Sequence, residues 1–432
     1  MRFIILNIVL TLIGLNISVS HCAESTVYKK LEVLSKVLSY VETNYIEEQK
    51  TEELIDNAVK GLLSGLDPHT VYMPPSLYRE MKEDTTGEFG GVGIEISVKD
   101  EQLTVVTPIE DTPAEKAGVK AGDVILKIEG VSAKGMSLLE AVKKIRGPHG
   151  SKVNITLQHK GETTTYDVVL NRERIAVKSV TSELVDKEYG YIRIKNFQEK
   201  TERELSRQFE RIQKETGKAP LKGLILDLRN NPGGLLEQAI RVADLFLEAG
   251  VIVSTMGRKG SFQEVKMAHK DGTLPEMPMI TLVNEGTASA SEIVAGALQD
   301  HRRSVILGAQ TFGKGSVQTI IDLEDGSGLK LTIARYYTPK GRSIQALGIA
   351  PDITISEVPP PLADAAYVRE KDLKGHIESP PLHDQGEKSE PHKSVPKSTL
   401  NIETDIQLRR ALEYLKTWEV FRTTLLLKIS PS

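Results

Sequence analysis

Three patterns of apolar and polar positions follow one another along the chain. Between residues 28 and 63, apolar residues recur at helical spacing, which predicts two helices in an N-terminal region covering 24–86. From 87 to 172 the period changes to two, with glycine turns and one helix, so a mostly β domain is expected there. From 173 to 356 strands alternate with helices, which is typical of an α/β core built on a mixed sheet.

The end of the chain predicts a linker and a final helix. Residues 357–400 are rich in proline and charge and nearly devoid of large apolar side chains, so a flexible, disordered linker is expected. In 401–432 an apolar stripe returns at helical spacing, made of Leu408, Ala411, Leu412 and Leu415. This helix is expected to pack on its own body, or else on a second subunit in a homodimer. The whole pattern predicts an α/β multidomain protein.

The first twenty residues predict export. Arg2 precedes an apolar stretch, and Ser18 and Ser20 form a small-x-small cleavage site, so 1–20 is expected to be a signal peptide of a secreted, periplasmic protein. An uncleaved membrane anchor is the alternative. Cys22 follows the stretch, but His21 makes a poor lipoprotein signal.

Length and composition exclude several classes of protein. A chain of 432 residues is too long for one compact core. The net charge of −4, without a basic block, argues against a nucleic-acid partner. A single cysteine excludes an intramolecular disulfide and a cysteine-based zinc site, and the nine histidines form no HExxH pair. We therefore expect neither a metal nor another cofactor.

Candidate chemistry begins in the stretch NEGTASASEIVAGALQDH (284–301). Ser289 and Glu292 match a capping box at a helix start, and on these residues alone a structural role is favoured. Lys314 follows Ser289 by 25 residues and lies between two glycines in TFGKGSVQ. Such a lysine is usually solvated. To act as a base for serine its pKa must fall by about 3 units from about 10.4, worth about 4 kcal/mol of desolvation, which an apolar pocket could supply.

Several long motifs carry a resemblance to a known family. In order they are LLSGLDPHTVYM, DLRNNPGG, NEGTASASE, TFGKGSVQ and YYTPKGRSIQALGIAPD. Together they closely resemble the C-terminal processing, or tail-specific, proteases, which are secreted serine proteases with a Ser-Lys catalytic pair and a PDZ domain. The likeness extends to about residue 355. Thr287 stands where these proteins more often have serine, and the tail beyond 357 lies outside the shared pattern.

The resemblance implies roles for particular residues. The third residue of TASAS, Ser289, would be the nucleophile, Lys314 the base, and Gln318 a residue that orients this base. Ser291 is the main rival as nucleophile, and otherwise it is a residue for the helix cap.

An oxyanion hole is also implied. The N–H of Ala290 lies next to the nucleophile at a helix N-terminus, where amides lack intrahelical partners. The second donor would come from Gly233 or Gly234 in NNPGG, where glycine lets the backbone approach a substrate. Without the resemblance, this segment would be interpreted as an ordinary turn after a strand.

Residues 87–172 resemble a PDZ domain, with PAEKAGVKAGDVILKIEG (113–130) as a second typical motif. Its carboxylate loop would contain Gly90, Gly91, Val92, Gly93 and Ile94, whose N–H groups converge on a terminal carboxylate while the next strand pairs with the peptide. Arg146 in IRGPHG is either a solvated residue or a link between this domain and the catalytic centre.

The expected function is that of a secreted serine endopeptidase that binds free, mostly apolar C-terminal tails of proteins and cuts through an acyl-enzyme. A regulatory or adaptor protein is a further expected partner. An inactive PDZ adaptor is the alternative, and the joint retention of Ser289, Lys314 and Gln318 argues against it. A hydrolase with an S-x-x-K pair is rejected, because both matches, Ser327–Lys330 and Ser394–Lys397, lie in a turn and in the linker.

Overall fold

The structure is a computed structural model, and it carries no ligand or partner chain. It describes residues 21–99, 102–217, 219–260, 263–355, 368–379 and 404–429. The predicted signal peptide and most of the predicted linker lie outside these ranges. None of the helices found within them has both the length and the apolar character that a membrane span requires.

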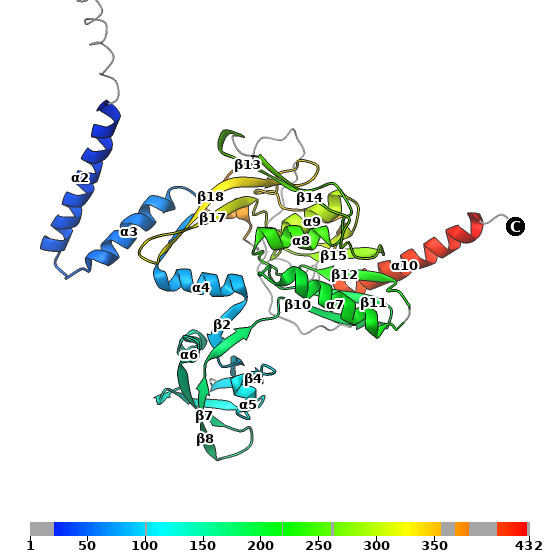
Figure 1. Ribbon diagram of the computed structural model, residues 1–432, viewed down its shortest axis with the longest axis horizontal. Helices are drawn as coiled ribbons and strands as arrows, with labels where there is room; N and C mark the ends of the chain where they lie inside the picture. The colour runs from blue at the N-terminus through cyan, green and yellow to red at the C-terminus, as the bar shows by residue number, and fades with distance from the viewer. Residues whose placement is uncertain are drawn as a thin grey trace, which may run out of the picture.

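The N-terminal region is helical, as the apolar spacing predicts. Two helices, α2 (His21–Asn44) and α3 (Thr51–Ser64), form an arm, and α2 projects away from the rest of the chain (Figure 1, dark blue). After β1 (Val71–Met73), helix α4 (Pro75–Thr86) leads toward the next domain. It ends at Gly87, whose φ of 71° is the left-handed conformation that glycine adopts without strain at a helix C-terminus.

A separate antiparallel sheet follows, with the strand order β3-β4-β5-β7-β8. Its strands are β3 (Ile94–Lys99), β4 (Gln102–Pro108), β5 (Val124–Ile128), β6 (Val131–Ser132), β7 (Lys152–Gln158) and β8 (Thr165–Asn171). The short α5 (Pro113–Lys116) and α6 (Leu138–Ile145) complete the domain. Alternating apolar residues such as Val153, Ile155 and Leu157 of β7 are fully buried in its core.

A two-stranded ribbon joins this domain to the rest of the chain. β2 (Glu88–Gly91) enters the domain and β9 (Glu173–Ala176) leaves it, and the two strands pair antiparallel (Figure 1). The N–H of Gly147 also donates to the carbonyl of Gly90 at 3.1 Å. The domain is thus attached through its own first and last strands.

The core of the molecule is a six-stranded mixed sheet in the order β10-β11-β12-β15-β16-β19. Its strands are β10 (Val180–Val185), β11 (Tyr189–Ile194), β12 (Gly223–Asp227), β15 (Met279–Val283), β16 (Val305–Gly308) and β19 (Ile353–Thr354). β10 is antiparallel to β11, and the other pairs are parallel. β12 and β15 are buried along their whole length, as central parallel strands covered on both faces are expected to be.

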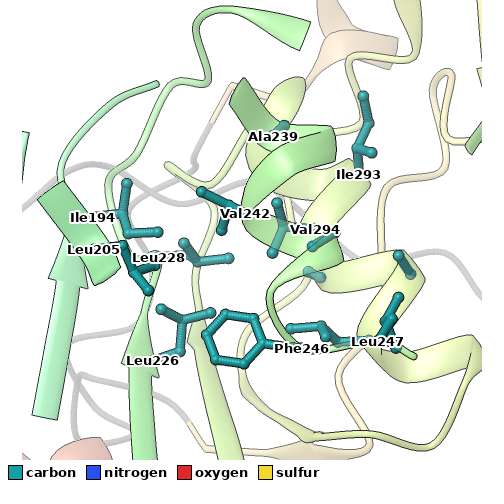
Figure 2. Close-up of a cluster of buried hydrophobic side chains, with 14 of the residues drawn as sticks. Ile194, Leu205, Leu226, Leu228, Ala239, Val242, Phe246, Leu247, Ile293 and Val294 are labelled. Carbon is teal, nitrogen blue, oxygen red and sulfur yellow. The ribbon is translucent and has the colours of Figure 1, made fainter. Parts of the chain in front are cut away.

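Three helices pack on one face of this sheet and one on the other. α7 (Thr201–Glu215), α8 (Leu236–Asp244) and α9 (Ala290–Asp300) enclose a cluster of buried side chains that includes Leu226, Val242 and Val294 (Figure 2). The opposite face receives α10 (Ile406–Ile429), which extends past the sheet (Figure 1, red). Its predicted stripe of Leu408, Ala411, Leu412 and Leu415 is buried there, so the helix packs on its own body.

A second, antiparallel sheet lies beside the core, and the sequence patterns did not predict it. It has the order β1-β18-β13-β14, and β17 also pairs with β18. Its longer strands are β13 (Val251–Gly257), β14 (Gln263–Met267), β17 (Ser316–Asp322) and β18 (Gly328–Tyr337). Because β1 joins β18, the N-terminal region is tied to this sheet.

Part of the predicted linker contacts the core. Residues 368–379 contain a 3-10 turn, η3 (Glu370–Asp372), in which the side chain of Glu370 is fully buried. The N–H of Glu370 donates to the carbonyl of Phe312 at 3.2 Å. This short stretch therefore belongs to the packed body of the protein.

Candidate active site

The candidate site lies where three neighbouring parallel strands end. β12, β15 and β16 run in the same direction, so the loops at their carboxyl ends meet at one edge of the sheet. The loop after β12 contains Gly233 and Gly234, and the loop after β15 leads into α9 at Ser289. The loop after β16 carries Lys314. Sheet topology thus brings together motifs that are far apart in the sequence.

Ser289 has an unusual backbone. Its φ of 56° and ψ of −116° lie in a region that residues with a side chain seldom occupy. Strain of this kind costs about 1–3 kcal/mol and concentrates at functional sites, where the surrounding structure enforces it. The residue stands immediately before α9 and is half-buried. Its conformation is therefore that of a residue placed by its surroundings rather than by local preference.

Glu292 connects the backbones of the two candidate catalytic residues. Its Oε2 accepts the N–H of Ser289 at 2.7 Å and the N–H of Lys314 at 2.9 Å. Its Oε1 accepts the Gly313 N–H at 2.8 Å and the Thr311 hydroxyl at 2.5 Å. Burial raises the pKa of this carboxyl to about 7, although the four donors favour its ionised form. The sequence predicts Glu292 only as part of the helix cap at Ser289. In the structure it also accepts the backbone N–H groups of the loop that carries Lys314.

Ser291, the rival nucleophile, is fully buried. Its hydroxyl donates to the carbonyl of Asn231 at 3.0 Å, which joins the start of α9 to the loop after β12. Thr287 has a similar structural contact, because its hydroxyl donates to the Leu228 carbonyl at 2.9 Å. A serine could make that bond too, so the departure from the family pattern at 287 keeps the contact. These contacts favour Ser289 over Ser291.

Lys314 is largely withdrawn from water. Burial lowers the pKa of its amine to about 8, and the positive charge of Lys330 lowers it further, while Glu370, Glu292 and Asp67 oppose the shift. The backbone beside it is closely packed, since a Cβ on Gly315 would lie 2.3 Å from the nitrogen of Gln345. An amine with this pKa is neutral in roughly a tenth of the molecules at pH 7, far more often than an ordinary lysine, and only the neutral form can act as a general base.

Gln318 lies on β17, four residues after the lysine. Its Nε2 donates to the hydroxyl of Ser316 at 2.7 Å. The strand carries it toward β18, where it pairs in register with Thr332. The structure therefore places Gln318 on the strand that follows Lys314, with its amide nitrogen bonded to a neighbour on the same strand.

The two glycines of NNPGG differ in their contacts. A Cβ on Gly233 would lie 2.9 Å from the Cβ of Ser289 and 3.0 Å from the nitrogen of Ala290, so this residue lies directly against the candidate nucleophile. Its N–H donates to Oδ1 of Asn231 at 2.9 Å. Gly234 has a φ of 137° and lies against Phe197, with 2.2 Å from its notional Cβ to that carbonyl oxygen. Both positions require glycine.

The predicted carboxylate loop spans the ribbon and the first strand of the separate antiparallel sheet. Gly90 and Gly91 lie in β2, and Ile94 begins β3. The Val92 side chain is buried in the domain core, so it lines no groove. β3 is the edge strand of its sheet and pairs with β4 on one side. An edge strand of this kind is what a peptide needs in order to add a further strand.

Arg146 lies at the ribbon. Its guanidinium stacks on the ring of Phe89 in β2, with 4.0 Å from Cζ to the ring centroid. Within the part of the chain that the structure describes, no contact joins Arg146 to Ser289 or Lys314. The structure therefore brings it to the connection between the domains rather than into the catalytic site.

Sequence reasoning missed a buried network beneath the site. Asp227 accepts bonds from the Tyr191 hydroxyl and from the guanidinium of Arg229, each at 2.7 Å. Arg229 also bridges to Asp405 at 2.7 Å, which ties the loop after β12 to the start of α10. Asp227 and Arg229 belong to the motif DLRNNPGG, so the motif marked the place. Their distant partner Asp405 gave no signal in the sequence.

Comparison with known proteins places the chain in a family. Residues 188–355 match peptidase family S41, and residues 104–159 match the PDZ domain. A carboxy-terminal-processing protease of Bartonella bacilliformis is 45% identical over 403 residues, which are 92% of this chain and 91% of that protein. A carboxy-terminal processing protease of Bacillus subtilis is 39% identical over 76% of this chain and 70% of its own length.

The chain is also similar in sequence to a protein of known structure. It is a photosystem II D1 C-terminal processing protease, 31% identical, aligned with 75% of this chain and 92% of its own at a TM-score of 0.44. Fold, site and relatives together define the class as a serine-type peptidase that carries a PDZ domain. The chain belongs to peptidase family S41, among the carboxy-terminal processing proteases.

Proposed function

We propose that this protein is an endopeptidase that binds the C-terminal tails of proteins through its PDZ domain and cuts them with Ser289 as nucleophile and Lys314 as general base. The observation that carries the proposal is that one oxygen of Glu292 accepts the backbone N–H groups of both residues, at 2.7 and 2.9 Å. The lowered pKa of Lys314, about 8 because of burial, supports the role of base.

The chemistry would follow in four steps. Neutral Lys314 takes the hydroxyl proton of Ser289 as Oγ attacks the substrate carbonyl carbon. The resulting oxyanion accepts the N–H of Ala290 and one from the Gly233–Gly234 pair. If Gly233 is the donor, its N–H must first break its bond to Oδ1 of Asn231. Among the described contacts, the N–H of Gly234 has no such bond to break. The lysine then protonates the leaving amine, and a water that it deprotonates hydrolyses the acyl-enzyme.

Gln318 would assist by accepting an N–H of Lys314 with Oε1, since its Nε2 is bonded to Ser316. Arg146 would link the PDZ domain to the catalytic centre from its position over the Phe89 ring at the ribbon. The open edge of β3 supports tail binding, with Ile94 as the apolar side chain near the carboxylate loop.

Location and assembly belong to the same proposal. The apolar stretch after Arg2 supports export across the inner membrane into the periplasm, with or without cleavage after Ser20. Exposed apolar side chains support a homodimer or an adaptor-bound form, and they lie on α2 and α10 (Val27, Leu31, Leu34, Val37, Trp418, Phe421). Sequencing the N-terminus of the exported protein and light scattering of it test these two points.

Cleavage is expected to depend on a free, apolar C-terminus. Amidation removes the carboxylate charge and weakens charge-assisted bonds worth about 1.5–3 kcal/mol each. A terminal aspartate must also be desolvated near Ile94. We expect amidation, or a final Asp, to slow cleavage of a tagged substrate at least about tenfold, which corresponds to about 1.4 kcal/mol. The measurement is kcat/KM for matched tails, and equal rates for free and amidated tails would indicate a general endopeptidase.

A further inference from the structure

A buried carboxylate from outside the matched peptidase region lies against the lysine loop. Glu370 belongs to η3 in the segment 368–379, and its side chain has no exposed surface. A buried carboxylate is costly unless hydrogen bonds satisfy its oxygens, so its partners show what holds it there. One contact is made by its backbone, whose N–H donates to the carbonyl of Phe312 at 3.2 Å, two residues before Lys314.

Both carboxylate oxygens of Glu370 have partners. Oε2 lies 2.7 Å from Nε2 of His69, a residue of the LDPHT segment between α3 and β1. Oε1 accepts the side-chain N–H of Gln345 at 2.9 Å. Gln345 is also fully buried, and its Oε1 accepts the N–H of Gly315 at 3.0 Å, one residue after Lys314. Glu370 thus holds the lysine loop on both sides of Lys314.

The charge of Glu370 also acts on the lysine. Burial by itself raises the pKa of Glu370, but hydrogen bonds from His69 and Gln345 hold it below its usual range, so the carboxylate is ionised. Four charged groups surround the amine of Lys314, namely Lys330 of β18, Glu292 of α9, Asp67 and Glu370. Glu370 is therefore one of the negative charges that raise the pKa of Lys314, against the lowering by burial and by Lys330. His69 holds this carboxylate in place.

We propose that Glu370 is a positioning residue for Lys314, held by His69 and acting through Gln345 and the carbonyl of Phe312. This inference rests on the proposed role of Lys314 as base. It assigns a part in catalysis to two residues that lie outside both the peptidase match at 188–355 and the PDZ match at 104–159. The loop of the base is then fixed jointly by segments before and after the peptidase region.

The test uses the full chain with Glu370→Ala and Glu370→Gln, and with Glu378→Gln as the matched control. Glu378 lies in the same segment and is exposed. The substrate is a fluorescent peptide with a free C-terminal alanine. Glu370→Ala is expected to lower kcat at least about tenfold with little change in KM, because Gln345 and His69 lose the carboxylate that holds them, while the backbone bond to Phe312 remains. Glu370→Gln keeps the shape and an acceptor for Gln345, so it is expected to recover most of that loss.

The pH profile separates this role from mere packing. A nearby negative charge favours the charged amine, so its removal in Glu370→Gln is expected to move the acidic limb of kcat/KM to lower pH. The control is expected to keep the wild-type profile. An unshifted limb in Glu370→Gln would overturn the proposal, as would a wild-type kcat in Glu370→Ala. If Glu370→Ala does not fold, the shift in Glu370→Gln decides alone.

Lys314→Ala, assayed in parallel, keeps the two proposals distinguishable. If it still cleaves the peptide, Lys314 is not the base and the proposed function fails at that point. If it is inactive while the Glu370 variants retain wild-type kcat and pH dependence, the base is right and the positioning role of Glu370 is wrong.

Discussion

Ser289→Ala is expected to lower kcat at least about ten-thousandfold, because loss of a serine nucleophile leaves only binding and the oxyanion hole. Stability should change little. The hydroxyl contributes at most a helix cap worth about 1 kcal/mol, and alanine retains the Cβ with which the strained backbone is already compatible. The measurements are single-turnover cleavage of a tagged substrate, thermal unfolding, and binding of a C-terminal peptide to the PDZ domain, which should be unchanged.

Ser291→Ala is the matched control, and it should show the opposite behaviour. Ser291 is buried and donates to the Asn231 carbonyl, so its loss is expected to reduce the free energy of unfolding by about 1–3 kcal/mol. Cleavage should persist, because the nucleophile remains. If Ser289→Ala cut at a rate comparable to wild type while Ser291→Ala were inactive, the nucleophile would be Ser291.

Lys314→Arg is expected to be as inactive as Lys314→Ala, with a loss of at least about a hundredfold in kcat/KM. A lysine amine whose pKa burial lowers to about 8 can accept the serine proton. A guanidinium keeps its proton even when buried and cannot act as this base. Keeping the positive charge in Lys314→Arg therefore does not restore activity. Initial rates of both variants at pH 9 are the measurement, since wild-type Lys314 is then mostly neutral.

Lys330→Arg is a suitable control for this experiment. Lys330 is also half-buried, and it keeps its positive charge near Lys314 in this variant. Lys330→Arg should cleave far better than Lys314→Arg, because residue 330 contributes only charge and does not accept the serine proton. Substantial cleavage by Lys314→Arg would show that another group accepts the proton.

The sequence patterns predicted the parts of the fold whose periodicity is local. The parallel strand β12 contains the apolar run 224–226, and the stripe from Leu408 to Leu415 repeats at helical spacing. The sequence patterns do not predict the second sheet, because its strands lack a regular alternation of buried and exposed residues. β18 has ten residues of which only a few are buried, and its partners β1 and β13 are distant in the sequence. Such pairing depends on tertiary contacts rather than on propensity.

The candidate site likewise contains residues that local motifs indicate and residues that only the folded chain brings together. Ser289, Lys314 and the glycines of NNPGG belong to contiguous motifs, so the family resemblance could indicate them. The second role of Glu292 depends on a loop that returns 22 residues later, and a capping pattern alone explained its presence. The sequence pattern places Glu370 in a linker, because its surroundings are rich in proline and charge. Its burial against His69 joins residues 301 positions apart, which no local pattern reveals.

The pH dependence of kcat/KM tests the central claim most directly. For a base that must be neutral, the rate should rise with pH through the pKa of Lys314, about 8, and level off above it. The experiment uses the wild-type protein and a tagged substrate with a free apolar C-terminus, from pH 5 to pH 9, with Ser289→Ala as the blank. We expect at least about a tenfold rise between pH 6 and pH 9. A flat profile over this range would contradict the assignment of Lys314 as the base.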